Sequence, residues 1–134
     1  MKVSELMIGN WVLISPMDCD PVAKRVTAIN YNSYRGKDYC DWIDVDGWDE
    51  LSEKEIQPIP ITAEILKKNG WIKDGHDEDA GDSYNYDNNK IWGWIDEGGM
   101  DIGFHGDNIC MSIKYVHQLQ HAMRLIGIEK EIVL

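Results

Sequence analysis

The segment Ile56–Leu66 constrains this chain more than any other, because two alternate prolines are followed directly by a threonine that can cap a helix. Proline lacks a backbone donor and disfavours helical geometry in the residue before it, so we expect Gln57 and Ile59 to be extended. Thr62 is placed to accept a hydrogen bond from a backbone amide two or three residues later. The backbone is therefore predicted to change from extended to helical at Ile61/Thr62.

The helix that begins at Thr62 is predicted to end at Asn69-Gly70, since glycine readily takes the left-handed conformation that terminates helices. This junction divides the chain into a β-rich unit, residues 1–61, and an α+β unit, residues 62–134. No segment has the composition of a flexible linker, so we expect the two units to pack together.

Short apolar or alternating runs, separated by turn residues, predict the strands of the first unit. These strands are expected over 11–14, 22–30, 39–45 and 56–61. Asp46-Gly47 is a strong hairpin signal, and Ser52–Glu55 fits a capping box on a one-turn helix. This order of elements is that of a small β-barrel of the Src-homology-3 type, a likeness of fold that carries no function.

The second unit is predicted to be a helix, an antiparallel meander and a second helix, which makes the fold class α+β. Four strands joined by short turns are expected over 84–86, 91–95, 100–105 and 109–113. A strand start at 71–73 and an acidic loop, Asp74–Asp82, precede them. The helix over 114–126 carries apolar residues at helical spacing that must face the sheet, namely Val116, Leu119, Met123 and Ile126.

The composition excludes several classes of protein. A net charge of −11 repels phosphate backbones, so direct binding of nucleic acid is disfavoured. No apolar run approaches the ~20 residues of a membrane helix, and the first residues contain no apolar signal-peptide core. The cysteine count, 3, is odd and the cysteines are widely spaced, which favours free thiols in a reducing cytoplasm.

Three segments, Glu5–Val12, Ile56–Leu66 and Tyr115–Gln120, resemble small proteins of gut Bacteroides and of their phages or integrated elements. The Pro-Ile-Pro-Ile-Thr junction and the His-Gln-Leu-Gln helix are the most specific parts. After the second glutamine this chain departs from the family, with His121 and Ala122 where asparagine and aromatic residues are usual. The resemblance implies a phage or mobile-element origin and a cytoplasmic setting, and it supplies no catalytic residues.

Two candidate metal sites fail on inspection of their spacing. His117 and His121 lie one helical turn apart, but Gln118 stands where a zinc protease has its glutamate, and no further histidine or paired cysteine is near. The Asp74–Asp82 loop is rich in carboxylates, yet counted from Asp77 its sixth position is not the glycine of a calcium-binding EF-hand. We therefore predict no metal and no cofactor.

Two groups of side chains are predicted to form a partner-contact surface. The first is a polar stripe on the second helix, made of His117, His121 and Arg124. The second is Trp92 and Trp94, which alternate on one face of a strand and would stack on a sugar or peptide if exposed. The second helix needs an apolar surface to cover, however, which favours burial or half-burial of both indoles beneath it.

No nucleophile elbow, phosphate-binding glycine loop or deaminase motif occurs in the chain. Cys110 lies mid-strand among apolar residues and is predicted to be in the core. The predicted function is a non-enzymatic accessory protein of a phage or mobile element that contacts an unidentified protein or a second copy of itself. Two alternatives stay open: an acidic nucleic-acid mimic that inhibits a host enzyme, and a hydrolase with an unrecognised site.

Overall fold

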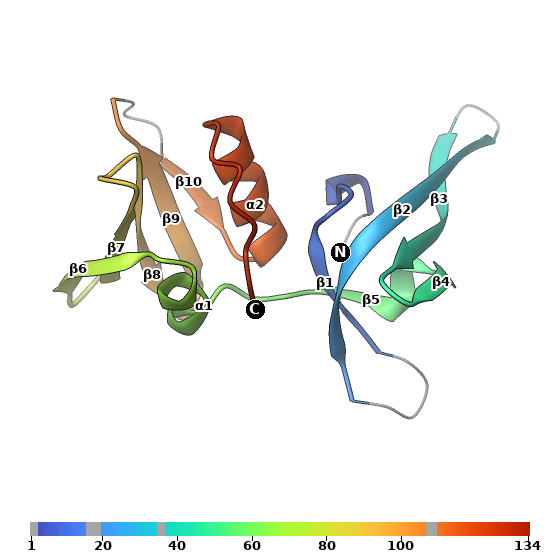
Figure 1. Ribbon diagram of the computed structural model, residues 1–134, viewed down its shortest axis with the longest axis horizontal. Helices are drawn as coiled ribbons and strands as arrows, with labels where there is room; N and C mark the ends of the chain where they lie inside the picture. The colour runs from blue at the N-terminus through green and yellow to red at the C-terminus, as the bar shows by residue number, and fades with distance from the viewer. Residues whose placement is uncertain (1–2, 16–19, 35–36, 107–109) are drawn as a thin grey trace. The chain divides into compact units, whose positions relative to one another are not determined.

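The computed structural model describes residues 3–15, 20–34, 37–106 and 110–134, with backbone only for residues 3, 31–34 and 37–41. This part of the chain is mixed α+β, with two antiparallel five-stranded sheets and two α-helices (Figure 1). The chain divides into two compact units, Met1–Ile59 and Pro60–Leu134. That the units pack together stays a prediction.

The sheet of the N-terminal unit has the strand order β4-β3-β2-β1-β5 and is strongly curled (Figure 1). Its strands are β1 (Trp11–Ile14), β2 (Val22–Tyr34), β3 (Lys37–Val45), β4 (Trp48–Leu51) and β5 (Ile56–Pro58). Two short 3-10 helices accompany them, η1 (Val3–Glu5) and η2 (Glu53–Glu55). The register of β2 against β3 shifts between Val26 and Ala28, the kind of irregularity that a β-bulge produces and that bends a strand.

Local sequence rules account for the turns of this unit. Gly47 has a φ of 79° in the turn between β3 and β4, as its hairpin signal predicts. The predicted capping box forms at η2, where the backbone amide and the hydroxyl of Ser52 both donate to Glu55, at 2.9 and 2.8 Å. These two hydrogen bonds, the backbone one first, lower the pKa of Glu55. Alternate residues of β1, Val12 and Ile14, point into the core.

The change from extended to helical backbone occurs where the prolines and the threonine predict it. β5 ends at Pro58, and Pro60 makes an isolated bridge with Tyr115. Thr62 then caps α1 (Ala63–Lys68), its hydroxyl accepting from the backbone amide of Ile65 at 3.3 Å. The helix ends at Asn69, and Gly70 follows with a φ of 86°.

The C-terminal unit contains a sheet of five strands in chain order, β10-β9-β8-β7-β6, followed by a helix. The elements are β6 (Ile72–Asp77), β7 (Gly81–Tyr86), β8 (Ile91–Asp96), β9 (Gly99–Phe104), β10 (Cys110–Ile113) and α2 (Val116–Leu125). The loop predicted over Asp74–Asp82 is wrong, because β6 continues through its first four residues to Asp77 and β7 already begins at Gly81. Polar side chains hold this strand to its neighbour: Asp74 accepts from Ser83 and Asn85, and His76 bonds to Asp82.

Helix α2 covers one face of this sheet (Figure 1). The buried aliphatic residues of that face are Ile91, Ile95, Ile102 and Ile113. Three of the four helix positions predicted to face the sheet are buried, namely Val116, Leu119 and Met123. The fourth, Ile126, is half-buried because α2 ends before it, at Leu125, and Gly127 follows with a φ of 77°.

Asn69 fixes the C-terminal tail to the end of α1. Its side-chain amide donates to the carbonyl of Val133 at 2.7 Å, and its carbonyl accepts from the amide of Val133 at 2.7 Å. The same amide donates to the carbonyl of Ile65 at 2.8 Å. Asn69 is 3% exposed, and its side chain satisfies the backbone amide and carbonyl of Val133 much as a neighbouring strand would.

Candidate functional site

The side of the C-terminal sheet that faces away from α2 carries both predicted tryptophans. Residues paired in an antiparallel register point to the same side, and neighbours along a strand alternate. One cross-strand row is therefore Ser83, Trp94, Asp101 and Ser112, and the next is Asn85, Trp92, Gly103 and Cys110. We call these two rows the tryptophan face.

Trp92 lies over the backbone of Gly103 on the neighbouring strand. A Cβ atom at position 103 would be 2.4 Å from Cζ2 of Trp92 and 2.7 Å from its Cε2 and Cη2. Only glycine leaves room for the indole there, so the ring rests on β9 and is half-buried. Position 103 thus determines how Trp92 is presented.

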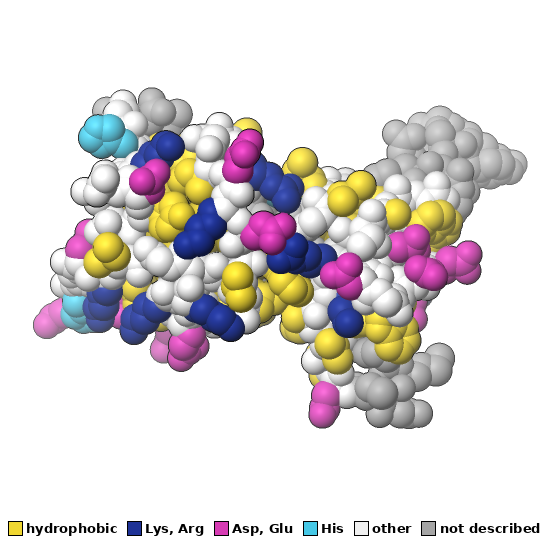
Figure 2. All heavy atoms as spheres, in the orientation of Figure 1, with side chains coloured by type: hydrophobic (Ala, Val, Ile, Leu, Met, Phe, Trp, Pro, Cys, Tyr) yellow, Lys and Arg dark blue, Asp and Glu magenta, His cyan; other side chains and the backbone are white. Residues whose placement is uncertain are grey.

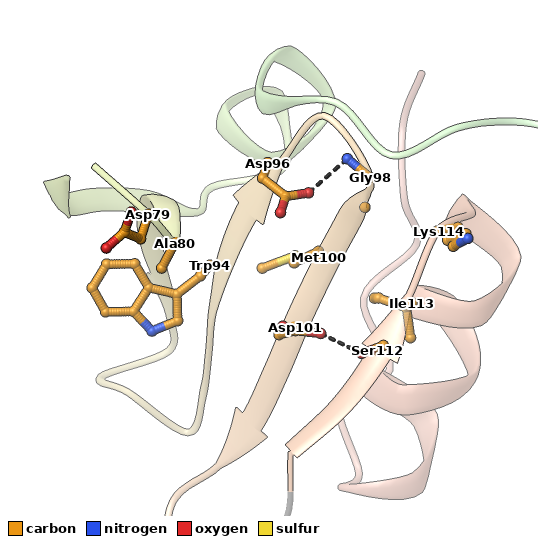
Figure 3. A pocket seen from close by; sticks show the side chains of 11 residues that line it. Asp79, Ala80, Trp94, Asp96, Gly98, Met100, Asp101, Ser112, Ile113 and Lys114 are labelled. Carbon is orange, nitrogen blue, oxygen red and sulfur yellow. Dashed lines mark hydrogen bonds between the residues drawn. The ribbon is translucent and has the colours of Figure 1, made fainter. Parts of the chain in front are cut away.

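Trp94 stands between two hollows in the surface. The larger, of about 350 Å³, is lined by Trp94 together with Asp79, Asp96, Asp101 and Lys114 among others. Figure 3 shows Trp94 and Asp79 at one side of it and Lys114 at the other, with Met100 between them. The smaller, of about 210 Å³, lies between Trp94 and Trp92 and reaches Asp74 and Ser83. Both hollows belong to the C-terminal unit.

Hydrogen bonds orient the aspartates around these hollows. Asp96 Oδ1 accepts from the amide of Gly98 at 2.6 Å, and Asp101 Oδ1 accepts from the hydroxyl of Ser112 (Figure 3). Asp74 accepts from Ser83 and Asn85, and these bonds, that of Ser83 first, lower the pKa of Asp74. A carboxylate with a lowered pKa is ionised at neutral pH.

Among the described residues none of the aspartates that line the hollows has a cationic partner within ion-pair distance. The ion pairs of the C-terminal unit lie elsewhere: Asp82 pairs with Lys73 at 2.9 Å and with His76 at 2.7 Å, and Asp87 pairs with Lys90 at 3.6 Å. The tryptophan face and the hollows beside it therefore combine half-buried indole surface with carboxylates that have no ion-pair partner among the described residues.

Trp92 and Trp94 are half-buried, one of the two outcomes predicted for them, but the prediction that they lie beneath a helix is wrong. α2 covers the opposite face, on which Ile91, Gly93 and Ile95 of the same strand are buried. Both indoles are half-buried on the side away from the helix. Alternation in β8 predicts that the two sets separate, but it does not predict which set meets the helix.

Cys110 is exposed, so its predicted place in the core is wrong. It pairs with Gly103, which puts it on the tryptophan face. Asp101 and Ser112 lie beside Trp94 in the same cross-strand row and were not predicted as part of a contact surface. The signal in the sequence is the alternation of side chains along each strand. Combined with the short turns that set the pairing of β8, β9 and β10, it places Asp101 and Ser112 on the same side of the sheet as Trp94.

The three residues of the predicted helix stripe are not together on the surface. His117 is fully buried, with its ring stacked on Tyr115 at 5.8 Å and meeting His121 edge-on at 6.0 Å between ring centroids. His121 is half-buried, and burial first and Arg124 second lower its pKa. Arg124 is exposed. Contact of His121 and Arg124 with a partner stays a prediction.

Within the described ranges no group of three or more histidine, cysteine, aspartate or glutamate side chains is placed to hold a metal ion. No helix in the same ranges is long and apolar enough to cross a membrane. Comparison of the chain with models of protein families, with curated proteins and with solved structures finds no match.

Proposed function

We propose that this chain is a non-enzymatic interaction protein that binds a partner protein through its tryptophan face. The observation that carries the proposal is the pair of half-exposed indoles, Trp92 and Trp94, on the side of the sheet that α2 leaves uncovered. Tryptophan is enriched at protein interfaces and is prominent among the residues whose truncation costs the most binding energy.

The surroundings of the indoles support a binding role over a structural one. The inner face already has an aliphatic core and a helix to cover it, so the sheet does not need the indoles for burial. Gly103 lets Trp92 pack closely on the backbone of β9, and a packed ring loses less entropy when a partner stacks on it. The hollows on either side of Trp94 can receive side chains from a partner.

Affinity capture with the full chain as bait tests the proposal. The matched variants are Trp92→Ala with Trp94→Ala on the tryptophan face, and Leu125→Ala, which removes a 78% exposed apolar side chain from α2. We expect one partner that the chain and the Leu125 variant retain and that the double variant loses, with folding of each checked by circular dichroism. Equal recovery by all three, or no partner at all, contradicts the proposal.

An acidic nucleic-acid mimic is the second candidate, supported by the net charge of −11 and by the uncompensated aspartates near Trp94. A mimic presents carboxylates along an extended face at the spacing of duplex phosphates. On the side of the C-terminal unit seen in Figure 2, acidic and basic side chains are mixed, which favours a local contact over duplex mimicry. Competition with duplex DNA for the captured partner distinguishes the two.

We also infer that the N-terminal unit is a small barrel of the Src-homology-3 type, with the strand order β4-β3-β2-β1-β5 and the one-turn helix before β5 as support. The proposed setting is the cytoplasm of a host carrying the phage or mobile element, which rests on the resemblance of the Pro-Ile-Pro-Ile-Thr and His-Gln-Leu-Gln segments.

A further inference from the structure

We propose that the larger hollow beside Trp94 binds the cationic side chain of an arginine or lysine presented by a basic polypeptide segment. The inference rests on the proposed function and names the chemistry that the tryptophan face recognises in its partner. It depends on three observations: the charge of the lining, the position of the indole and the size of the hollow.

The charge of the lining favours a cation. Three aspartates, Asp79, Asp96 and Asp101, are among the residues that line the hollow, against one lysine, Lys114. The described part of the chain offers none of these four groups an ion-pair partner. A cation that enters the hollow therefore meets an excess of negative charge without having to displace a resident ion pair.

The hydrogen bonds within the hollow leave acceptors for an incoming donor. Gly98 and Ser112 each occupy Oδ1 of their aspartate, Asp96 and Asp101 respectively, so Oδ2 of each carboxylate is the oxygen to which a ligand can donate. A guanidinium group carries five N–H donors in a planar fork, and an ammonium carries three. Serine and the backbone amide thus orient the carboxylates without neutralising them.

Trp94 supplies the wall on which a cation can also be bound. A guanidinium or ammonium within about 6 Å of an indole centroid is attracted by the negative face of the ring. The volume of about 350 Å³ is at the small end of ligand pockets, which begin at about 300 Å³. The hollow is accordingly suited to one long side chain, while Trp92, in the next row, is available for a neighbouring residue of the segment.

A neutral oligosaccharide is the other ligand that would stack on these indoles, and the lining disfavours it. A neutral ligand would displace water from the carboxylates without providing an opposite charge, which costs free energy. A basic side chain offsets that cost through charge-assisted hydrogen bonds. The two ligand classes therefore differ in their dependence on Asp101 and on salt.

Titration of the full chain, labelled with ¹⁵N, tests the inference with acetyl-Gly-Gly-Arg-Gly-Gly-amide as the probe. The reporter is the indole N–H signal of Trp94, assigned with a Trp94→Phe variant. We expect a saturable shift with the arginine peptide, and binding about tenfold weaker, or about 1.4 kcal/mol, for the same peptide with neutral citrulline in place of arginine. Added salt should weaken binding of the arginine peptide.

Two charge variants locate the effect. Asp101→Asn removes a carboxylate from the hollow, whereas Glu97→Gln removes one from the turn between β8 and β9 without touching the lining. We expect Asp101→Asn to weaken binding of the arginine peptide and Glu97→Gln to leave it close to that of the unmodified chain. Equal weakening by both would show a general effect of net charge and would overturn the assignment to the hollow.

Three further outcomes overturn the inference: equal binding of the arginine and citrulline peptides, a shift of Trp94 with maltohexaose but not with the arginine peptide, or no shift with any probe. Failure of the proposed function looks different, because there the captured partner does not depend on Trp92 and Trp94. A partner that needs both indoles but is insensitive to Asp101→Asn would retain the function and reject the cationic ligand.

Discussion

The two faces of the C-terminal sheet are built from alternate residues of the same strands, yet they serve different ends. On β8 the inner side chains, Ile91 and Ile95, are buried, whereas Trp92 and Trp94 between them are half-exposed and flanked by aspartate and serine. The largest apolar side chains of the strand are thus on the side that the fold leaves uncovered. Stability is concentrated on one face and capacity for recognition on the other, and this division can be tested face by face.

The largest effect is expected for truncation of the inner face. Ile102 is fully buried in the middle of β9, so Ile102→Ala should lower the free energy of unfolding by about 2–5 kcal/mol through lost burial and a residual cavity. Denaturant titration measures the change. Ile72→Ala, which truncates a 64% exposed side chain on β6, is the control and should cost less than about 0.5 kcal/mol. Similar losses in both variants would contradict the division between faces.

A smaller effect is expected where the outer face is most tightly packed. Gly103→Ala places a Cβ 2.4 Å from Cζ2 of Trp92, so the indole must move off β9, at a cost of about 1–3 kcal/mol. In a Trp92→Ala background the same substitution has nothing to displace and should be close to neutral. A double-mutant cycle by denaturant titration measures the coupling. An uncoupled pair would show that the ring does not rest on Gly103.

Removal of a buried hydroxyl tests whether the face covered by α2 is stabilised by apolar contacts alone. Tyr84 is 1% exposed, and within the described chain its hydroxyl has no hydrogen-bond partner. Tyr84→Phe removes this buried hydroxyl and should leave stability unchanged or raise it by about 1 kcal/mol. Thermal and denaturant unfolding measure the effect. A loss of stability would show that the hydroxyl is satisfied in solution and that the inner face is less strictly apolar.

The two sides of the sheet also differ in the pH at which they respond. Burial and Arg124 lower the pKa of His121, on the covering helix, below 6.5, so the unfolded chain takes up the proton first. His121 therefore destabilises the fold as the pH falls below 6.5, and His121→Gln should give a flatter stability curve between about pH 7 and 5. Asp74 acts at lower pH, because its pKa is lowered from 3.8 in the folded chain. It stabilises the fold above pH 3.8, and this stabilisation is lost as the pH falls through the pKa of the folded state.

Stability measured against pH for the chain and for the His121 variant checks this smallest effect. Identical curves above pH 5 would show that His121 titrates alike in the folded and unfolded states.

Local rules made the junction and the turns predictable from the sequence. Thr62, Gly70 and the Ser52–Glu55 box each act through backbone hydrogen bonds or φ angles within a few residues, and each is found as expected. The apolar stripe of α2 is equally local, because helical spacing alone places Val116 and Leu119 on one side.

The features that sequence reasoning missed depend on partners distant in the chain. Strand β6 lacks an apolar pattern, and cross-strand bonds such as those from Ser83 and Asn85 to Asp74 hold it in place. The need of the second helix for an apolar surface predicts that it covers the indoles, but the side of β8 with Ile91, Gly93 and Ile95 is the one that meets it. His117 is buried although polar residues predominate on its side of the helix.

The hydrogen bonds between the Asn69 side chain and the backbone of Ile65 and Val133 have a chemical consequence. In flexible peptides an asparagine followed by glycine loses its amide readily, because the next backbone nitrogen can attack the side-chain carbonyl. Here the side-chain amide of Asn69 is hydrogen-bonded to the carbonyls of Ile65 and Val133, and the residue is 3% exposed. The folded chain should therefore resist deamidation at Asn69-Gly70. The rate at which aspartate or isoaspartate accumulates at position 69, measured by peptide mass spectrometry, would then report how often the C-terminal tail detaches from the end of α1.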